Sequence, residues 1–328
     1  MKRFIYETLH PEIYHGHHQR PPYFEGWYYR LIDATENVRY AVIPGVFLGP
    51  NGHAFIQILE GHTRRTAFHT FPLDQFHADR ERFAVRIGDN HFTQDGIRLN
   101  LDRAEPLGHI RGELGFTGGQ PWPVTLRSPG IMGWYAWIPT MECYHGVLSF
   151  DHAITGVLEV EGARHDFTGG RGYIEKDWGK SFPAGYIWFQ SNHFSTPRTC
   201  LTASIAIIPW LRASFPGLIV GLWQDGKLRR FATYTGAKTE RLEVDDTHVF
   251  WVVSDREARL EMTATQAAGG LIYGPTRESM GKRVDETLDA SIHVRLVGRG
   301  GSVLYEGRGR HAGLEINGDI ARLLTASK

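Results

Sequence analysis

The stretch PPYFEGWYYR at residues 21–30 has a counterpart about 150 residues later, GYIEKDWG at residues 172–179. Each stretch places carboxyl groups among large aromatic rings. An apolar wall favours the uncharged form of a carboxyl group, because desolvation penalises charge. An aromatic face attracts a nearby cation through its quadrupole. Together these properties predict a site that protonates an apolar molecule and stabilises the resulting positive charge.

The composition around these stretches is that of a globular protein. The chain has 328 residues, of which 41% are hydrophobic, and its formal net charge is zero. This length suits two ordinary domains or one large β domain. A balanced charge lacks the basic field that attracts nucleic acid, so no nucleic-acid partner is expected. Cys143 and Cys200 are the only cysteines, which favours neither a disulfide scaffold nor a zinc cluster.

No segment of the sequence has the pattern of a membrane or export signal. Residues 1–7, MKRFIYE, carry charges but no apolar core of a signal peptide. The apolar stretch at residues 201–211 is too short to span a bilayer. We therefore expect a soluble, cytoplasmic protein without a transmembrane segment.

Short strand-like runs separated by turn dipeptides recur along the chain. Asn51-Gly52, Glu161-Gly162, Asp225-Gly226 and residues 298–301 each separate two such runs. Asn-Gly and Asp-Gly are typical of tight hairpins, because both central residues take positive φ. The pattern predicts an all-β fold of barrels or sandwiches.

The Gly-rich residues 169–172 suggest a junction between two β domains, at residues 1–170 and 171–328. Two aromatic runs, WYAW at residues 134–137 and YIWF at residues 186–189, read as strands with rings on both faces. A β-barrel lined with such rings is a natural container for a flat apolar ligand.

Histidines and glycines give no specific metal or cofactor motif. His15, His17 and His18 form a cluster, but further ligands at metal-binding spacing are missing, so a solvated turn or a surface patch and no metal are expected. His145 and His152 lie in a strand-like run and are expected to be half-buried structural histidines or pocket residues. No nucleophile elbow, phosphate loop or dinucleotide fingerprint occurs.

Three carboxylates within the aromatic stretches are candidate acids: Glu25, Glu175 and Asp177. Each also has a structural alternative. Glu25 could pair with Arg30 or another buried base, and the other two could pair with Lys176 and Arg171. The residues alone leave both readings open.

The two stretches resemble the tocopherol cyclase family. PYFEGWYYR at residues 22–30 is similar to the F-E-G-W-Y-x-R segment of the plant members, and YIEKDWGKSFPAGYIWFQSNHF at residues 173–194 is similar to a second segment, S-E-K-x-W-G followed by F-P and W-x-W-x-Q-x-N-x-F. A weaker similarity covers residues 290–318. The resemblance implies two lipocalin-like β-barrel domains in tandem. It also implies an intramolecular cyclase that protonates a prenyl double bond and traps the carbocation with a phenol oxygen, without a cofactor.

The resemblance also carries roles for individual residues. It implies Glu175 first and Glu25 second as the general acid, whereas Asp177 stands where the plant sequence has an amide, which weakens it as an obligatory acid. The residues expected to bind the substrate, through aromatic faces or hydrogen bonds, are Trp27, Tyr28, Trp178, Trp188, Gln190 and Asn192.

Two other functions fit the same sequence. One is a non-catalytic lipocalin-like binder of an apolar metabolite, and the other is a double-bond hydratase of the carotenoid hydratase type. In addition, either aromatic stretch could be a structural plug that closes a barrel. In all cases the expected partner is a small apolar or prenylated molecule, collected during transient contact with a membrane.

Overall fold

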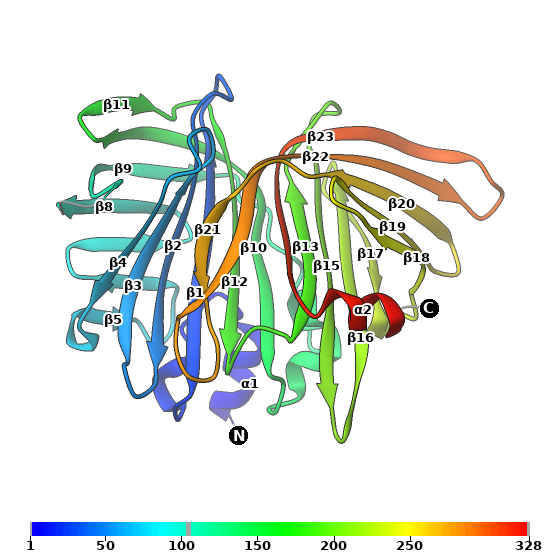
Figure 1. The fold of residues 1–328 in the computed structure, drawn as a ribbon, viewed down its shortest axis with the longest axis horizontal. Coiled ribbons are helices and arrows are strands. Elements are labelled where there is room, and N and C mark those ends of the chain that lie inside the picture. The colour runs from blue at the N-terminus through cyan, green and yellow to red at the C-terminus, as the bar shows by residue number, and fades with distance from the viewer. Residues whose placement is uncertain (1, 103–105, 327–328) are drawn as a thin grey trace. The chain divides into compact units, whose positions relative to one another are not determined.

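The computed structural model describes residues 2–102 and 106–326 and is mostly β (Figure 1). It divides into two compact units, Met1–Phe182 with Gly270–Arg283, and Pro183–Gly269 with Val284–Lys328. Each unit is built on an antiparallel sheet. The predicted fold class, all-β with two lipocalin-like β domains in tandem, is confirmed.

The first unit contains one long antiparallel sheet. Its strands follow the order β4-β3-β2-β1-β12-β10-β9-β8-β7-β6-β5, with β11 paired to β10. The strands of this sheet are β1 Tyr23–Ile32, β2 Arg39–Leu48, β3 His53–Glu60, β4 Thr66–Phe71, β5 Phe76–Ala78, β6 Ala84–Ile87, β7 Asn90–Thr93, β8 Gly96–Asp102, β9 His109–Thr117, β10 Cys143–Val160, β11 Ala163–Asp166 and β12 Arg171–Gly179. The strand β21 Gly270–Gly274 belongs to the first unit but not to this sheet. The helices are α1 Lys2–Leu9 and the short 3-10 helices η1 Gly16–His18, η2 Leu73–Gln75 and η3 Gly130–Trp137.

The second unit is also built on an antiparallel sheet, which has fewer strands. Their order is β17-β16-β15-β13-β23-β22-β20-β19-β18, and β14 pairs with β23. The strands are β13 Gly185–Ser191, β14 His193–Phe194, β15 Thr199–Trp210, β16 Ala213–Gln224, β17 Lys227–Ala232, β18 Lys238–Val244, β19 His248–Ser254, β20 Ala258–Thr265, β22 Lys282–Gly298 and β23 Val303–Gly318. The helices are η4 Thr233–Thr235 and α2 Ile320–Ala326.

Two of the predicted tight turns have the expected geometry, whereas Asn51 and Gly52 connect their strands without positive φ. Glu161 and Gly162 connect β10 and β11 with φ values of 52° and 81°. Asp225 and Gly226 connect β16 and β17 with φ values of 47° and 80°. Two successive positive φ values are the geometry that matches the twist of a two-residue hairpin.

The two aromatic–carboxylate stretches are neighbours in space. They form β1 and β12, which pair in an antiparallel register from Phe24 opposite Gly179 to Ile32 opposite Arg171. β12 also pairs with β10 on its other side (Figure 1). The strand β12 is an inner strand of the first sheet, so it belongs to the first unit and the predicted junction at residues 170 and 171 is wrong. The chain passes from the first unit to the second between Phe182 and Pro183.

Each unit has its own apolar core. In the first unit the core includes Trp27, Tyr29, Ile174 and Trp178. In the second unit it includes Phe189 and other residues of the sheet. None of the helices in the described residues has the length and apolar character needed to cross a membrane.

Residues 134–137 do not form the predicted strand. They are the end of η3, a pair of 3-10 turns joined at Gly133, whose φ of 58° and ψ of −144° break the helix. A left-handed φ is readily adopted by glycine. The aromatic pattern predicted a strand because consecutive rings favour one, whereas Gly130 and Gly133, which precede these rings with φ values of 64° and 58°, allow short turns.

Gly45 and Gly26 face each other across β2 and β1 and give a matched test of the sheet. A Cβ on Gly45 would overlap the ring of Phe55 and lie 2.8 Å from the backbone oxygen of Glu25. On Gly26 the nearest atom would be 3.6 Å away. We expect Gly45→Ala to destabilise the first unit by about 1–3 kcal/mol, because an overpacked site must shift backbone. Gly26→Ala should leave its unfolding midpoint nearly unchanged, measured by urea denaturation. Equal effects of the two variants would contradict the packing.

Candidate functional site

Strand alternation divides the residues of β1 and β12 between two faces of the sheet. Successive side chains of a strand point to opposite faces. Glu25 and Trp27 therefore share a face with their register neighbours Trp178 and Lys176. Tyr28 shares the other face with its partner Glu175, and Asp177 lies on that face as well. The two acids ranked first by the sequence are thus on opposite faces.

On the core face, Glu25 forms a fully buried ion pair with Lys176. Their side chains are 0% exposed, and Lys176 Nζ lies 2.6 Å from Glu25 Oε1. The backbone N–H of His15 donates to both carboxylate oxygens, at 3.1 and 2.9 Å, and the Tyr23 hydroxyl also donates to Oε2. Burial raises the pKa of Glu25, but Lys176 and His15 outweigh it, so the pKa lies below its usual value. Glu25 is therefore an ionised structural group at neutral pH.

The remaining protons of Lys176 hold the chain that precedes β1. Its ammonium donates to the backbone oxygens of Pro11, at 3.0 Å, and Ile13. It also lies 2.8 Å from His15 Nδ1. The residues around His15 are thus fastened to the sheet, which differs from the solvated turn expected from sequence.

Trp27 and Trp178 pack against this ammonium group. Lys176 Nζ lies 5.1 Å from the ring centroid of Trp27 and 4.5 Å from that of Trp178. His15 stacks on Trp178 with centroids 4.6 Å apart. The cation that these two rings face is a side chain of the protein, so the geometry gives them a structural role.

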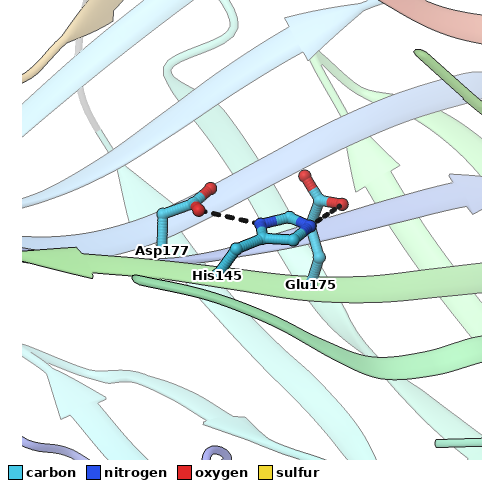
Figure 2. Close-up of side chains that lie close together, drawn as sticks. All are labelled: His145, Glu175 and Asp177. Carbon is cyan, nitrogen blue, oxygen red and sulfur yellow. Dashed lines mark hydrogen bonds and ion pairs between the residues drawn. The ribbon is translucent and has the colours of Figure 1, made fainter. Parts of the chain in front are cut away.

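The opposite face carries a linear group of three ionisable side chains. His145 on β10 stands opposite Asp177 in the register, and its Nδ1 lies 2.8 Å from Asp177 Oδ1. Its Nε2 lies 3.7 Å from Glu175 Oε2. Figure 2 shows the imidazole between the two carboxylates. The Tyr173 hydroxyl donates to Glu175 Oε2.

The two carboxylates control the charge of His145. Burial lowers the pKa of the imidazole, but Asp177 and Glu175 more than compensate and raise the pKa to about 9. The Glu175 side chain is 6% exposed, whereas that of Asp177 is 27% exposed. The imidazole of His145 is therefore protonated at neutral pH. It lies between Glu175, which is buried, and Asp177, which water can approach.

An apolar cluster continues this face along β1. Phe24 packs with Phe47, Phe55 and Met280. Between Phe24 and Tyr28, the only position on this face is Gly26, which faces Asp177 in the register and brings no side chain. Ionisable and aromatic groups are thus adjacent on one face of one sheet.

The same three residues also satisfy a simple criterion for a metal site. His145, Glu175 and Asp177 each offer a ligand atom, and these atoms all lie within 4.8 Å of one another. Both ring nitrogens of His145, however, face carboxylates. A cation would have to displace the imidazole proton, because a histidine ligand must be neutral. The arrangement fits a held proton better than a metal ion.

The other predicted substrate-binding residues belong to the second unit. Trp188 and Gln190 lie on β13 and are buried, and Trp188 stands opposite Glu315 of β23. Asn192 follows β13, and its Oδ1 lies 2.8 Å from His193 Nδ1. Their role in binding stays a prediction.

Sequence reasoning did not select His145 as a site residue. Its position in a strand-like run was visible, but its pairing with β12 was not. His152, the other histidine of that run, is different: burial lowers its pKa to about 3, and the missing side chain of Gly172 leaves room for its ring. The two histidines differ in their register partners on β12, because His145 stands opposite Asp177 and His152 stands opposite Gly172.

Comparisons with known proteins agree with the sequence resemblance. A family model described as tocopherol cyclase-like matches residues 120–318. A probable chloroplastic tocopherol cyclase of Oryza sativa subsp. japonica is 24% identical over 211 residues, covering 56% of this chain and 45% of that protein. The chloroplastic tocopherol cyclase of Zea mays is 24% identical over 213 residues, covering 56% and 44%. The matches thus span less than half of each plant protein.

Solved structures share the fold at low sequence identity. The crystal structure of CghA matches with a TM-score of 0.54 and 11% identity, covering 91% of this chain and 89% of that one. A protein described as a putative AttH from Nitrosomonas europaea matches with a TM-score of 0.52 and 16% identity, covering 90% and 92%. These similarities support the fold of the whole chain.

The buried ion pair can be tested by removing one or both charges. Lys176→Met should cost about 3–5 kcal/mol of unfolding free energy, because it leaves the Glu25 carboxylate buried without a countercharge. The double variant Glu25→Gln/Lys176→Met should recover most of this loss. Urea denaturation followed by tryptophan fluorescence measures both. A double variant as unstable as Lys176→Met would contradict the assigned pairing.

The charge of His145 predicts a pH dependence. Its pKa of about 9 in the folded chain lies above the ordinary 6.5, so its charge stabilises the fold fully below pH 6.5. That contribution, at most about 3 kcal/mol, should fade as the pH rises from 6.5 to about 9. NMR titration of the imidazole should give a midpoint near 9, which Asp177→Asn lowers. A wild-type midpoint near 6.5 would contradict the bridge.

Proposed function

The chain belongs to the tocopherol cyclase-like family, and from that premise we propose that it is a cofactor-independent cyclase acting on a prenylated quinol or a similar apolar phenol. The observation that carries the proposal is the imidazole of His145 held between two carboxylates on one face of the first sheet. Closing an oxygen ring on a prenyl chain is an isomerisation. It needs one proton delivered to carbon and one proton removed from oxygen.

The first step uses Glu175. An apolar substrate that displaces water from this carboxylate favours its uncharged acid form, because desolvation penalises charge. The proton comes from His145 Nε2, which lies 3.7 Å from Glu175 in the resting arrangement. Glu175 then protonates the double bond, breaking the π bond and forming a C–H bond. The positive charge develops on the tertiary carbon.

The second step closes the ring and returns the proton. The phenol oxygen attacks the tertiary carbon, forming the C–O bond, and its O–H bond breaks. Asp177, hydrogen-bonded to His145 Nδ1 at 2.8 Å, stands at the more exposed end of the group and accepts this proton. The imidazole still carries its Nδ1 proton, so Asp177 releases the accepted proton to water at its exposed end, and His145 Nε2 takes one proton from solvent, which restores the starting state. No electrons are gained or lost, so the reaction requires no redox cofactor.

The roles proposed for the three residues predict distinct effects of substitution. With a geranylgeranyl-type quinol, Glu175→Gln should lower kcat by about 100-fold or more, since general acid catalysis commonly contributes 10²–10⁴-fold. His145→Asn should have a similar effect. Asp177→Asn should lower kcat less, by about tenfold, because water can take the proton at this exposed end. Glu113 is an exposed carboxylate of β9 outside the group, so Glu113→Gln serves as the control and should retain full activity.

Mass spectrometry of the product distinguishes the competing functions. A cyclic isomer has the mass of the substrate and one free phenol hydroxyl fewer. A product heavier by one water would instead indicate a hydratase, and tight binding with unchanged substrate would indicate a carrier. Either result, or equal activity of Glu175→Gln and the wild type, would overturn the proposed cyclase. Activity that a chelator abolishes would favour a metal ion at the three residues.

A further inference from the structure

Several exposed apolar side chains of the first unit lie in segments that contain none of the residues proposed for catalysis. Phe4 and Ile5 of α1 are each 40% exposed, and Trp134 of η3 is 42% exposed. In the loop between β9 and η3, Val124 is 38% and Leu126 is 68% exposed. Large apolar areas of this kind commonly mark interaction sites.

Contacts bring α1, η3 and the loop before η3 together. The ring of Phe4 lies 6.0 Å from that of Trp137, and the indole N–H of Trp137 donates to the backbone oxygen of Leu126 at 3.0 Å. The bend at Gly133 places Trp134 at the start of the second 3-10 turn, where it stacks on Tyr135 at 4.1 Å. We call the exposed residues Phe4, Ile5, Val124, Leu126 and Trp134 the α1–η3 surface.

The two segments that carry this surface contain more basic than acidic residues: Lys2, Arg3 and Arg127 against Glu7. Between Leu114 and Met141 the sequence has no acidic residue, and Arg127 is its one charged side chain. Arg127 is exposed and follows Leu126 directly, and Lys2 is exposed on α1. The acid of α1, Glu7, is neutralised by Arg3 at 2.7 Å. The two segments therefore combine exposed apolar groups with two exposed basic side chains and a net positive charge.

We infer that the α1–η3 surface docks on a lipid bilayer with anionic headgroups. Tryptophan and tyrosine favour the membrane–water interface, where the ring is partly immersed and its polar atom stays wet. Apolar side chains such as Leu126 and Ile5 enter the acyl boundary, and Lys2 and Arg127 remain among the headgroups. This assigns a surface to the membrane contact expected from the sequence. It does not depend on the proposed reaction, because docking requires no substrate.

Vesicle flotation tests the inference on the full chain. Wild type should float with vesicles of phosphatidylcholine and phosphatidylglycerol and much less with phosphatidylcholine alone. The double variant Leu126→Ser/Trp134→Ser should lower the partition coefficient by about tenfold or more. Arg127→Glu should lower it by about fivefold or more on anionic vesicles only. The matched control is Leu304→Ser, since Leu304 is 53% exposed and lies outside this surface.

The outcome that overturns the inference is equally direct. Wild type that stays in the soluble fraction with anionic vesicles, or variants that float as well as wild type, would exclude this surface as the docking site. Sedimentation analysis adds a second check: a dimer that Leu126→Ser/Trp134→Ser dissociates would assign the surface to a second copy of the chain. Circular dichroism of each variant confirms that lost flotation is not lost folding.

Discussion

The buried ion pair between Glu25 and Lys176 is the constraint on which the first unit depends. A charge placed in an apolar core is strongly unfavourable unless it is paired and hydrogen-bonded. Here each charge has several partners, and the partners come from three parts of the chain: β1, β12 and the segment around His15. The pair can form only when all three are assembled. It therefore specifies which strands are neighbours as well as stabilising them.

The same pair explains why two stretches far apart in sequence carry such similar residues. They are adjacent strands, and aromatic rings on both cover one ammonium group. Strand alternation then divides each stretch between two purposes. Lys176 points into the core, and its neighbours Glu175 and Asp177 point to the other face. The fold signature and the candidate site are thus the same stretch of sequence but not the same residues.

Local sequence was enough to predict much of the fold. Dipeptides such as Asp225-Gly226 require positive φ, and alternating runs require a half-buried strand, so the turns and the all-β class followed from local chemistry. The junction at residues 170 and 171 did not, because a Gly-rich stretch looks the same at a domain boundary and inside a sheet. The position of β12 depends on pairing with β1, which is a long-range property.

The candidate site was only half predictable for the same reason. Glu175 and Asp177 stood out because of their aromatic surroundings, but those surroundings say nothing about the face on which each side chain lies. Glu25 shares the pattern and has a different environment, with Lys176 at 2.6 Å. The partner that gives Glu175 and Asp177 a common proton, His145, is contributed by β10 and has no aromatic motif of its own.

Parity along β12 also governs how changes within this strand should be interpreted. Loss of activity on altering Lys176 would follow from an unpaired charge in the core, and it would appear first as lost stability. Loss on altering Glu175 would follow from the missing proton donor, with the core pair intact. Adjacent residues of one motif therefore affect different properties: Lys176 affects the stability of the fold, and Glu175 affects the chemical step. A motif of this kind is evidence for a fold at alternate positions and for chemistry at the positions between them.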